Sequence, residues 1–134
     1  MANPFSVDLS GKTAVVTGGG GILCGEMSHA LADCRARIAV LDLRAEAAER
    51  VAEEIRAKGG EAIGVACNVL ERSSLESARE TVEAEYGSCD ILINGAGGNH
   101  PKGTTSREHL YPEDLTNPPE GTVTFYDLDR SEER

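Results

Sequence analysis

A run of four glycines near the start of the sequence, followed at a distance by a carboxylate, is the pattern most able to do chemistry. Gly18–Gly21 follow the β-branched segment "KTAVVT", and Asp42 ends a second apolar segment. Glycine allows a tight turn and lets a ligand approach the backbone closely. A glycine-rich turn before a helix can hold a pyrophosphate, and a carboxylate about 20 residues later can bind the adenosine ribose. The pattern predicts dinucleotide binding, although Asp42 could also act as a helix N-cap.

Alternating strands and helices are predicted to position these residues. Short apolar, β-branched segments indicate strands buried in a parallel sheet, and segments with helical spacing of apolar residues separate them. This alternation predicts an α/β fold, a Rossmann-type doubly wound parallel sheet with strand order 3-2-1-4. The expected strands are 12–17, 37–43, 61–69 and 90–94, and the expected helices are 25–33, about 45–58 and 73–86.

Three helix ends have specific signals. The second helix should stop at Gly59-Gly60, where a left-handed backbone conformation carries no steric cost. The first helix has Arg35 near the equivalent place, so strain of about 1 kcal/mol or a remodelled turn is expected there. The third helix should begin with a capping box, with Ser73 as N-cap and Glu76 three residues later.

Three motifs in order resemble the short-chain dehydrogenase/reductase family over Lys12 to Gly98. "TGGGGILCG" resembles its T-G-x-x-x-G-x-G loop, with Ile22 and Cys24 in place of later glycines. "CNV" resembles a D-V pair that holds the adenine, with Asn68 in place of Asp. "ILINGAGG" resembles N-N-A-G, with Gly95 for the second Asn. The glycine loop and "GGNHP" look most like the branch described as D-mannonate oxidoreductases or fructuronate reductases.

The resemblance implies a nicotinamide-dependent oxidoreductase that acts on a secondary alcohol or ketone, possible substrates being sugar acids. NAD is expected in preference to NADP, because Asp42 would accept from both ribose hydroxyls and repel a 2′-phosphate, which only Arg44 nearby could attract. Asn68 could instead cap a strand end, and Asn94 is expected to be largely structural. The implied cofactor-binding residues are Thr17, Gly18, Gly20, Gly21, Ile22, Leu23, Asp42, Asn68, Val69, Asn94, Gly95 and Ala96.

The family's catalytic residues have no counterpart in the sequence. A Tyr with a Lys four residues later would serve as the acid or base, but the residues that follow Tyr86, Tyr111 and Tyr126 at that spacing are Asp90, Leu115 and Arg130. The chain is therefore expected to be a cofactor-binding half-domain (1–98) followed by a Pro-rich loop and tail (99–134), truncated before its catalytic residues and inactive alone. A small-molecule substrate is expected only for a full-length form. The alternatives are a non-catalytic nucleotide-binding or interaction module and, against the motifs, a methyltransferase-like domain.

Composition restricts the remaining partners. A formal net charge of −10, from 23 acidic and 13 basic residues, disfavours nucleic acid and membrane surfaces. A cytoplasmic location is expected, because the first residues lack a basic and apolar leader pattern. Four cysteines without a C-x-x-C pair and three histidines without ligand spacing predict no metal site. The fourth strand should form an exposed apolar edge that favours self-association.

Overall fold

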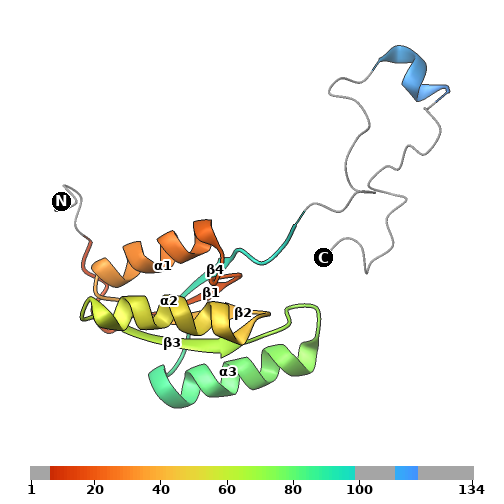
Figure 1. The fold of residues 1–134 in the computed structure, drawn as a ribbon. Coiled ribbons are helices and arrows are strands. Elements are labelled where there is room, and N and C mark those ends of the chain that lie inside the picture. Colours follow the sequence, from red (N-terminus) through yellow and green to blue (C-terminus); the bar gives the residue numbers. More distant parts are fainter. Residues whose placement is uncertain (1–6, 99–110, 118–134) are drawn as a thin grey trace. The chain divides into compact units, whose positions relative to one another are not determined.

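The computed structural model describes residues 7–98 and 111–117 of the 134-residue chain. The chain divides into two units, Met1–Ala96 and Gly97–Arg134. The described part of the second unit contains the 3-10 helix η2 (Pro112–Leu115). The first unit carries β1 (Thr13–Thr17), α1 (Ile22–Asp33), β2 (Arg37–Asp42), α2 (Ala45–Ala57), β3 (Glu61–Ala66), α3 (Arg72–Tyr86) and β4 (Ile91–Asn94) (Figure 1).

The four strands form one parallel sheet in the order β3-β2-β1-β4, which confirms the predicted fold class and strand order. Thr13 of β1 is in register with Arg37 of β2, and Ala14 with Ile91 of β4. All five residues of β1 are buried, as expected for a strand that has a neighbour on each side and a helix layer on each face. The carboxyl ends of β1, β2 and β4 therefore lie along one edge of the sheet.

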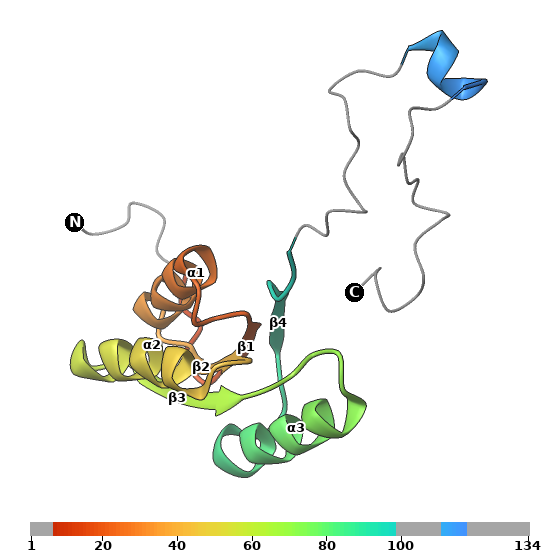
Figure 2. The same ribbon diagram turned by 45° about the vertical axis from the view of Figure 1, so that its right-hand side comes forward.

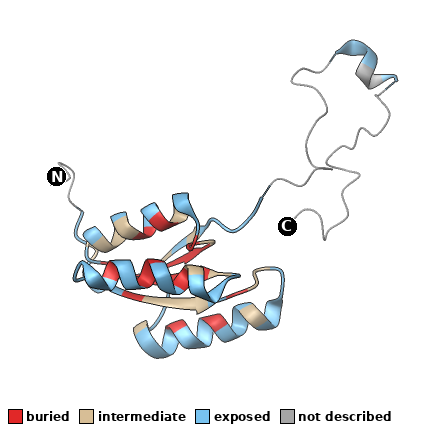
Figure 3. Ribbon diagram, viewed as in Figure 1, coloured by how far each residue is buried: buried red, intermediate tan, exposed pale blue. Residues whose placement is uncertain are grey.

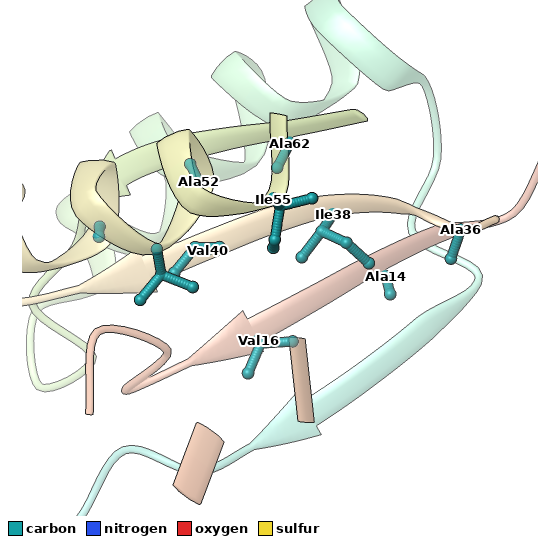
Figure 4. Close-up of a cluster of buried hydrophobic side chains, with 10 residues drawn as sticks. Ala14, Val16, Ala36, Ile38, Val40, Ala52, Ile55 and Ala62 are labelled. Atoms are coloured by element: carbon teal, nitrogen blue, oxygen red, sulfur yellow. The ribbon is translucent and has the colours of Figure 1, made fainter. Parts of the chain in front are cut away.

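Helices α1 and α2 cover one face of the sheet, and α3 lies on the other (Figures 1 and 2). Neighbouring strand residues point to opposite faces, so each strand supplies both cores. Val16 and Ile38 pack with Ile55 of α2 (Figure 4). Val51 of α2 belongs to the same buried cluster. On the other face, Val15, Ala39 and Leu41 pack with Ala78 and Val82 of α3. The buried residues of α2 lie on its sheet-facing stripe, as the predicted helical spacing requires (Figure 3).

A residue shortly after each of α1 and α2 has the left-handed backbone conformation considered from the sequence. Gly59 has a φ of 88° after α2, and Arg35 has a φ of 69° after α1, so the strained arginine is confirmed. After α1, the Arg35 N–H donates to the Ala32 carbonyl at 2.8 Å and the Ala36 N–H to the Leu31 carbonyl at 3.2 Å. These bonds form a Schellman motif. The Arg35 guanidinium also pairs with Asp8, which helps to hold the turn.

Several predicted boundaries were wrong. Helix α1 begins at Ile22 and not at Gly25, because the glycine run itself supplies the N-cap, Gly21. Helix α3 begins at Arg72, its N-cap is Glu71, and no side chain caps it, so the Ser73 capping box does not form. Strand β3 ends at Ala66, and residues 67–69 belong to the loop that follows.

Candidate functional site

The glycine-rich loop, residues 18–21, connects β1 to α1 at the carboxyl edge of the sheet. Gly18 has a φ of 65°, a backbone angle that residues other than glycine rarely adopt. A Cβ at Gly19 would lie 2.7 Å from the Val40 side chain, and one at Gly20 would lie 2.6 Å from the Cβ of Ala47. A Cβ at Gly21 would meet less, since its nearest contact would be the Gly18 carbonyl oxygen at 3.3 Å, which is tight but longer than the contacts at Gly19 and Gly20. Packing against β2 and α2 therefore explains two of the four glycines without any ligand.

Asp42 at the end of β2 is tied to this loop. Its Oδ2 accepts from the Gly20 N–H at 3.1 Å, and its Oδ1 accepts from the Arg44 N–H at 3.0 Å. The N-cap of α2 is Arg44 and has no side-chain bond, so Asp42 forms a local turn and does not cap the helix. Its side chain is 12% exposed. Each carboxylate oxygen has a further lone pair, so the group can still accept bonds from a ligand.

The start of α1 provides free backbone donors beside the loop. The Gly25 N–H is the first of the helix to bond back, to the Gly21 carbonyl at 2.9 Å. The N–H groups of the first turn precede any intrahelical acceptor, and the helix dipole makes this end attractive to anions. Ile22 and Leu23 occupy this turn with side chains 89% and 76% exposed.

Thr17 joins the loop to the end of β4. Its hydroxyl oxygen accepts from the N–H groups of Gly95 at 3.1 Å and Ala96 at 3.2 Å, and the hydroxyl donates to the Ile93 carbonyl at 3.4 Å. One hydroxyl thus fixes the backbone where β4 leaves the sheet. Asn94, the residue expected to pin β4, is exposed and borders a cavity of about 560 Å³ between β4 and α3.

Two departures from the family motifs meet in space. A Cβ at Gly95 would clash with the Cys24 sulfur and would lie 2.8 Å from the Thr17 carbonyl oxygen. Cys24 stands where the motif has a glycine, and Gly95 stands where it has an asparagine. The sulfur occupies the space that a side chain at position 95 would need, so the two replacements compensate for each other.

Asn68 organises the loop between β3 and α3. Its N–H donates to the Ser74 hydroxyl at 2.9 Å, its side-chain carbonyl accepts from the Leu70 N–H at 3.1 Å, and its amide donates to Glu71 at 3.0 Å. Ser74 is therefore used by the loop, and Ser73, the predicted N-cap, lies inside the first turn of α3. Val69 is half-buried beside the α3 core.

The structure thus brings Thr17, Gly18, Gly95 and Ala96 into one cluster and Gly20 and Asp42 into another, at the same edge of the sheet. Sequence reasoning missed Arg50 of α2, whose Nη2 donates to the Gly20 carbonyl at 3.0 Å. Its only sequence signal was an i,i+4 pairing with Glu54, which is common on solvated helix faces.

Two of the three tyrosines, the residue type expected to provide an acid or base, lie in the described ranges. Tyr86 lies at the end of α3, with the Arg37 guanidinium 5.6 Å from its ring centre, and burial raises the pKa of its phenol. Tyr111 is exposed. The described residues contain no group of three potential metal ligands. Tyr126, Arg130, His100 and His109 lie outside the described residues, as does most of the predicted 99–134 segment.

A parallel sheet with a glycine-rich turn after its first strand and an acidic residue ending its second defines a Rossmann-type domain of the nucleotide-binding class. Comparison with known proteins gives the family. The short chain dehydrogenase model matches residues 12–116, and the chain belongs to that family.

Individual relatives support this assignment. An uncharacterized oxidoreductase of Haemophilus influenzae is 48% identical over 124 residues, 92% of this chain and 42% of the relative. A solved Haemophilus protein described as a D-mannonate oxidoreductase, with bound NAD, has a TM-score of 0.73 at 45% identity, covering 94% of this chain and 44% of that one. A metagenomic short-chain oxidoreductase in complex with NADP has a TM-score of 0.63 at 34% identity, covering 67% and 41%.

The chain spans less than half the length of each of these relatives. Among the residues that the structure describes, no helix has the length and apolar character needed to span a membrane.

Proposed function

We propose that this chain is the NAD-binding portion of an oxidoreductase that interconverts a secondary alcohol and a ketone. The observation that carries the proposal is the placement of Asp42: its carboxylate ends β2 and bonds to the N–H of Gly20 in the glycine-rich loop at 3.1 Å. This arrangement joins a ribose acceptor to a phosphate-binding turn. The family membership supports it.

The residues present fit a dinucleotide. The free N–H groups of the first turn of α1 suit a pyrophosphate, and Gly21, the N-cap of α1, brings no side chain beside them. Asp42 retains lone pairs for the adenosine ribose, and Asn68 with Val69 is the proposed adenine contact. Gly95 and Ala96, held by Thr17, would border the cofactor at the end of β4. A bound nicotinamide would supply the hydride acceptor or donor of the reaction.

NAD is the proposed cofactor, in preference to NADP. The Asp42 carboxylate would accept from the 2′- and 3′-hydroxyls of NAD, whereas it would repel a 2′-phosphate. Arg44 is the opposing charge, with its Nε 3.9 Å from Asp42 Oδ1 and a side chain that is 73% exposed. An exposed arginine already paired with the carboxylate is a weak site for a phosphate. The NAD found in the Haemophilus structure agrees with this choice.

Calorimetric titration of the unmodified chain and of Asp42→Ala with NAD and with NADP tests the proposal. The unmodified chain should bind NAD more tightly than NADP. Asp42→Ala should weaken NAD by about tenfold, the loss of roughly one charged hydrogen bond, and weaken NADP less. Tighter NADP binding by the unmodified chain would contradict the cofactor assignment, and no binding of either would contradict the function.

The proposed substrate class is a sugar acid such as mannonate or fructuronate. Catalysis would require a catalytic Ser and a Tyr-Lys pair that this sequence does not contain. The support is the similarity to the Haemophilus protein described as a D-mannonate oxidoreductase. Reduction of sugar keto-acids should be measured with this chain and with a longer protein that adds a Ser and a Y-x-x-x-K sequence. Only the longer protein should turn over, and turnover by this chain alone would contradict the proposal.

A further inference from the structure

Arg50 connects the helix layer to the glycine-rich loop. It lies on α2, and its guanidinium donates through Nη2 to the Gly20 carbonyl at 3.0 Å and through Nη1 to Glu54 Oε1 at 2.9 Å. Arg50 belongs to none of the motifs that mark the family. Arg50 hydrogen-bonds to the loop from the helix layer, whereas Asp42 hydrogen-bonds to it from the sheet.

Glu54, the acidic partner of Arg50 on α2, is itself contacted by a residue of α1. His29 Nε2 of α1 lies 3.1 Å from Glu54 Oε2, so each carboxylate oxygen of Glu54 has its own partner. The His29 side chain is 14% exposed. Hydrogen bonds from His29 and then from Arg50 hold the pKa of Glu54 below its usual value. The chain of contacts therefore runs from α1 through α2 to the loop, and it restrains Arg50 in the orientation that reaches Gly20.

Gly20 needs such restraint because it has no side chain of its own. Glycine loses more backbone freedom on ordering than any other residue. The Gly20 N–H is fixed by Asp42 Oδ2 at 3.1 Å, and its carbonyl is fixed by Arg50 at 3.0 Å. The two contacts hold the peptide groups on both sides of Gly20. They thereby set the direction in which the backbone enters α1, whose first N–H groups are the proposed phosphate donors.

We propose that Arg50 is a positioning residue that pre-orders the glycine-rich loop for the cofactor pyrophosphate, acting through the Gly20 carbonyl and not by touching the cofactor. The inference rests on the proposed NAD binding. A loop that is ordered before binding loses less entropy when the ligand arrives. Removing the guanidinium should therefore weaken NAD affinity even though the fold stays intact.

The rival explanation is that Arg50 and Glu54 form only a surface ion pair. Arg79 and Glu83 on α3 supply a matched control, since they are also an i,i+4 pair, 3.2 Å apart, and their glutamate is as exposed as Glu54, at 46%. Arg79 belongs to α3, on the face of the sheet opposite α1 and α2 (Figure 2), and among the described residues it makes no hydrogen bond or ion pair with the glycine-rich loop. Arg79→Met removes a comparable ion pair without affecting the loop.

The experiment combines NAD titration with amide hydrogen exchange of ligand-free protein. Arg50→Met should weaken NAD binding by about tenfold, a change of about 1.4 kcal/mol, and should speed exchange within residues 18–25. Arg79→Met should leave both within twofold of the unmodified chain. Arg50→Lys should recover part of the affinity, because an ammonium can still donate to the Gly20 carbonyl. This conservative variant also serves if Arg50→Met does not fold.

The outcomes separate the two proposals. If the unmodified chain does not bind NAD, the proposed function fails, and the exchange data alone decide whether Arg50 orders the loop. If the unmodified chain binds NAD but Arg50→Met binds it equally well, or shows unchanged exchange in the loop, the positioning role is overturned. An equal loss in Arg79→Met would also overturn it.

Discussion

Individual glycines in the loop have different roles, which the sequence could not distinguish. The sequence pattern predicts space for a phosphate, and the position of the run after a strand correctly predicts the turn. The structure assigns Gly19 and Gly20 to close packing against Val40 and Ala47, while a Cβ at Gly21 would meet only the Gly18 carbonyl oxygen, at 3.3 Å. These contacts join residues far apart in the sequence, so no local pattern predicts them.

Replacing Gly20 and Gly21 by alanine should therefore have unequal effects. Gly20→Ala places a Cβ 2.6 Å from the Cβ of Ala47 and 2.9 Å from Asp42 Oδ2, so we expect destabilisation of about 1–3 kcal/mol, typical of overpacking. Gly21→Ala is the control: its φ of −80° suits alanine, and we expect a change below about 1 kcal/mol. Urea denaturation measures both, and equal losses would contradict the packing assignment.

The contact between Cys24 and position 95 gives a second residue-scale prediction. Gly95→Ala should destabilise the chain by about 1–3 kcal/mol, because its Cβ meets the Cys24 sulfur and lies 2.8 Å from the Thr17 carbonyl. Adding Cys24→Ala should recover part of this loss, since the sulfur is removed but the carbonyl stays. A double-mutant cycle should give a coupling on the order of 1 kcal/mol. Additive effects would show that the two positions do not compensate.

At the scale of elements, the strands and helices were largely predictable and their ends were not. Buried strand patterns and helical stripes depend on spacing within a few residues, which the sequence displays directly. The predicted start of α3 at Ser73 is wrong: the helix begins at Arg72, directly after a loop that is held by contacts such as the Asn68 N–H to the Ser74 hydroxyl. Arg50 was missed because its role depends on a loop carbonyl 30 residues away.

The start of β4 should carry a pH-dependent part of the stability. Asp90 accepts from the Thr13 N–H at 2.9 Å and from Lys12 Nζ at 3.0 Å, and these bonds, the first being the larger cause, lower its pKa below 3.8. Because the folded-state pKa is the lower one, the charged form adds stability above pH 3.8 that is lost as pH falls through the folded-state value. Asp90→Asn should remove this contribution.

Urea denaturation of the unmodified chain and of Asp90→Asn between pH 7 and pH 3 tests this prediction. The unmodified chain should be more stable at pH 7, and the difference should shrink at acid pH. Lys12→Met is the control, since it removes the smaller cause and should keep most of the pH dependence. A difference independent of pH would contradict the assigned role of the carboxylate.

At the scale of the whole molecule, the class of protein was predictable because three motifs occur in order at the carboxyl ends of β1, β3 and β4. The described sheet ends at β4, where Leu92 is 56% exposed and borders the cavity of about 560 Å³ lined by apolar residues of α3. An exposed apolar strand edge favours pairing with another chain. Self-association of the isolated chain therefore stays a prediction.

Leu92→Lys should reduce that self-association, because a charge on an edge strand opposes pairing. Light scattering over a range of concentrations should show a lower mean mass for Leu92→Lys than for the unmodified chain. Leu70→Lys is the control, since Leu70 is 50% exposed in the loop before α3 and away from the strand edge. A monomeric unmodified chain with a sharp two-state melt would contradict the prediction.

The position of β1 between β2 and β4 also sets an order for folding. Pairing β1 with β2 closes a short stretch of chain, whereas the Thr17 bond to Gly95 spans 78 residues. Longer closures cost more entropy and slow the search for native contacts. We therefore expect β1, α1 and β2 to form the nucleus and β4 to join late. The glycine-rich loop would meet Asp42 early in folding and receive its contacts from the end of β4 last.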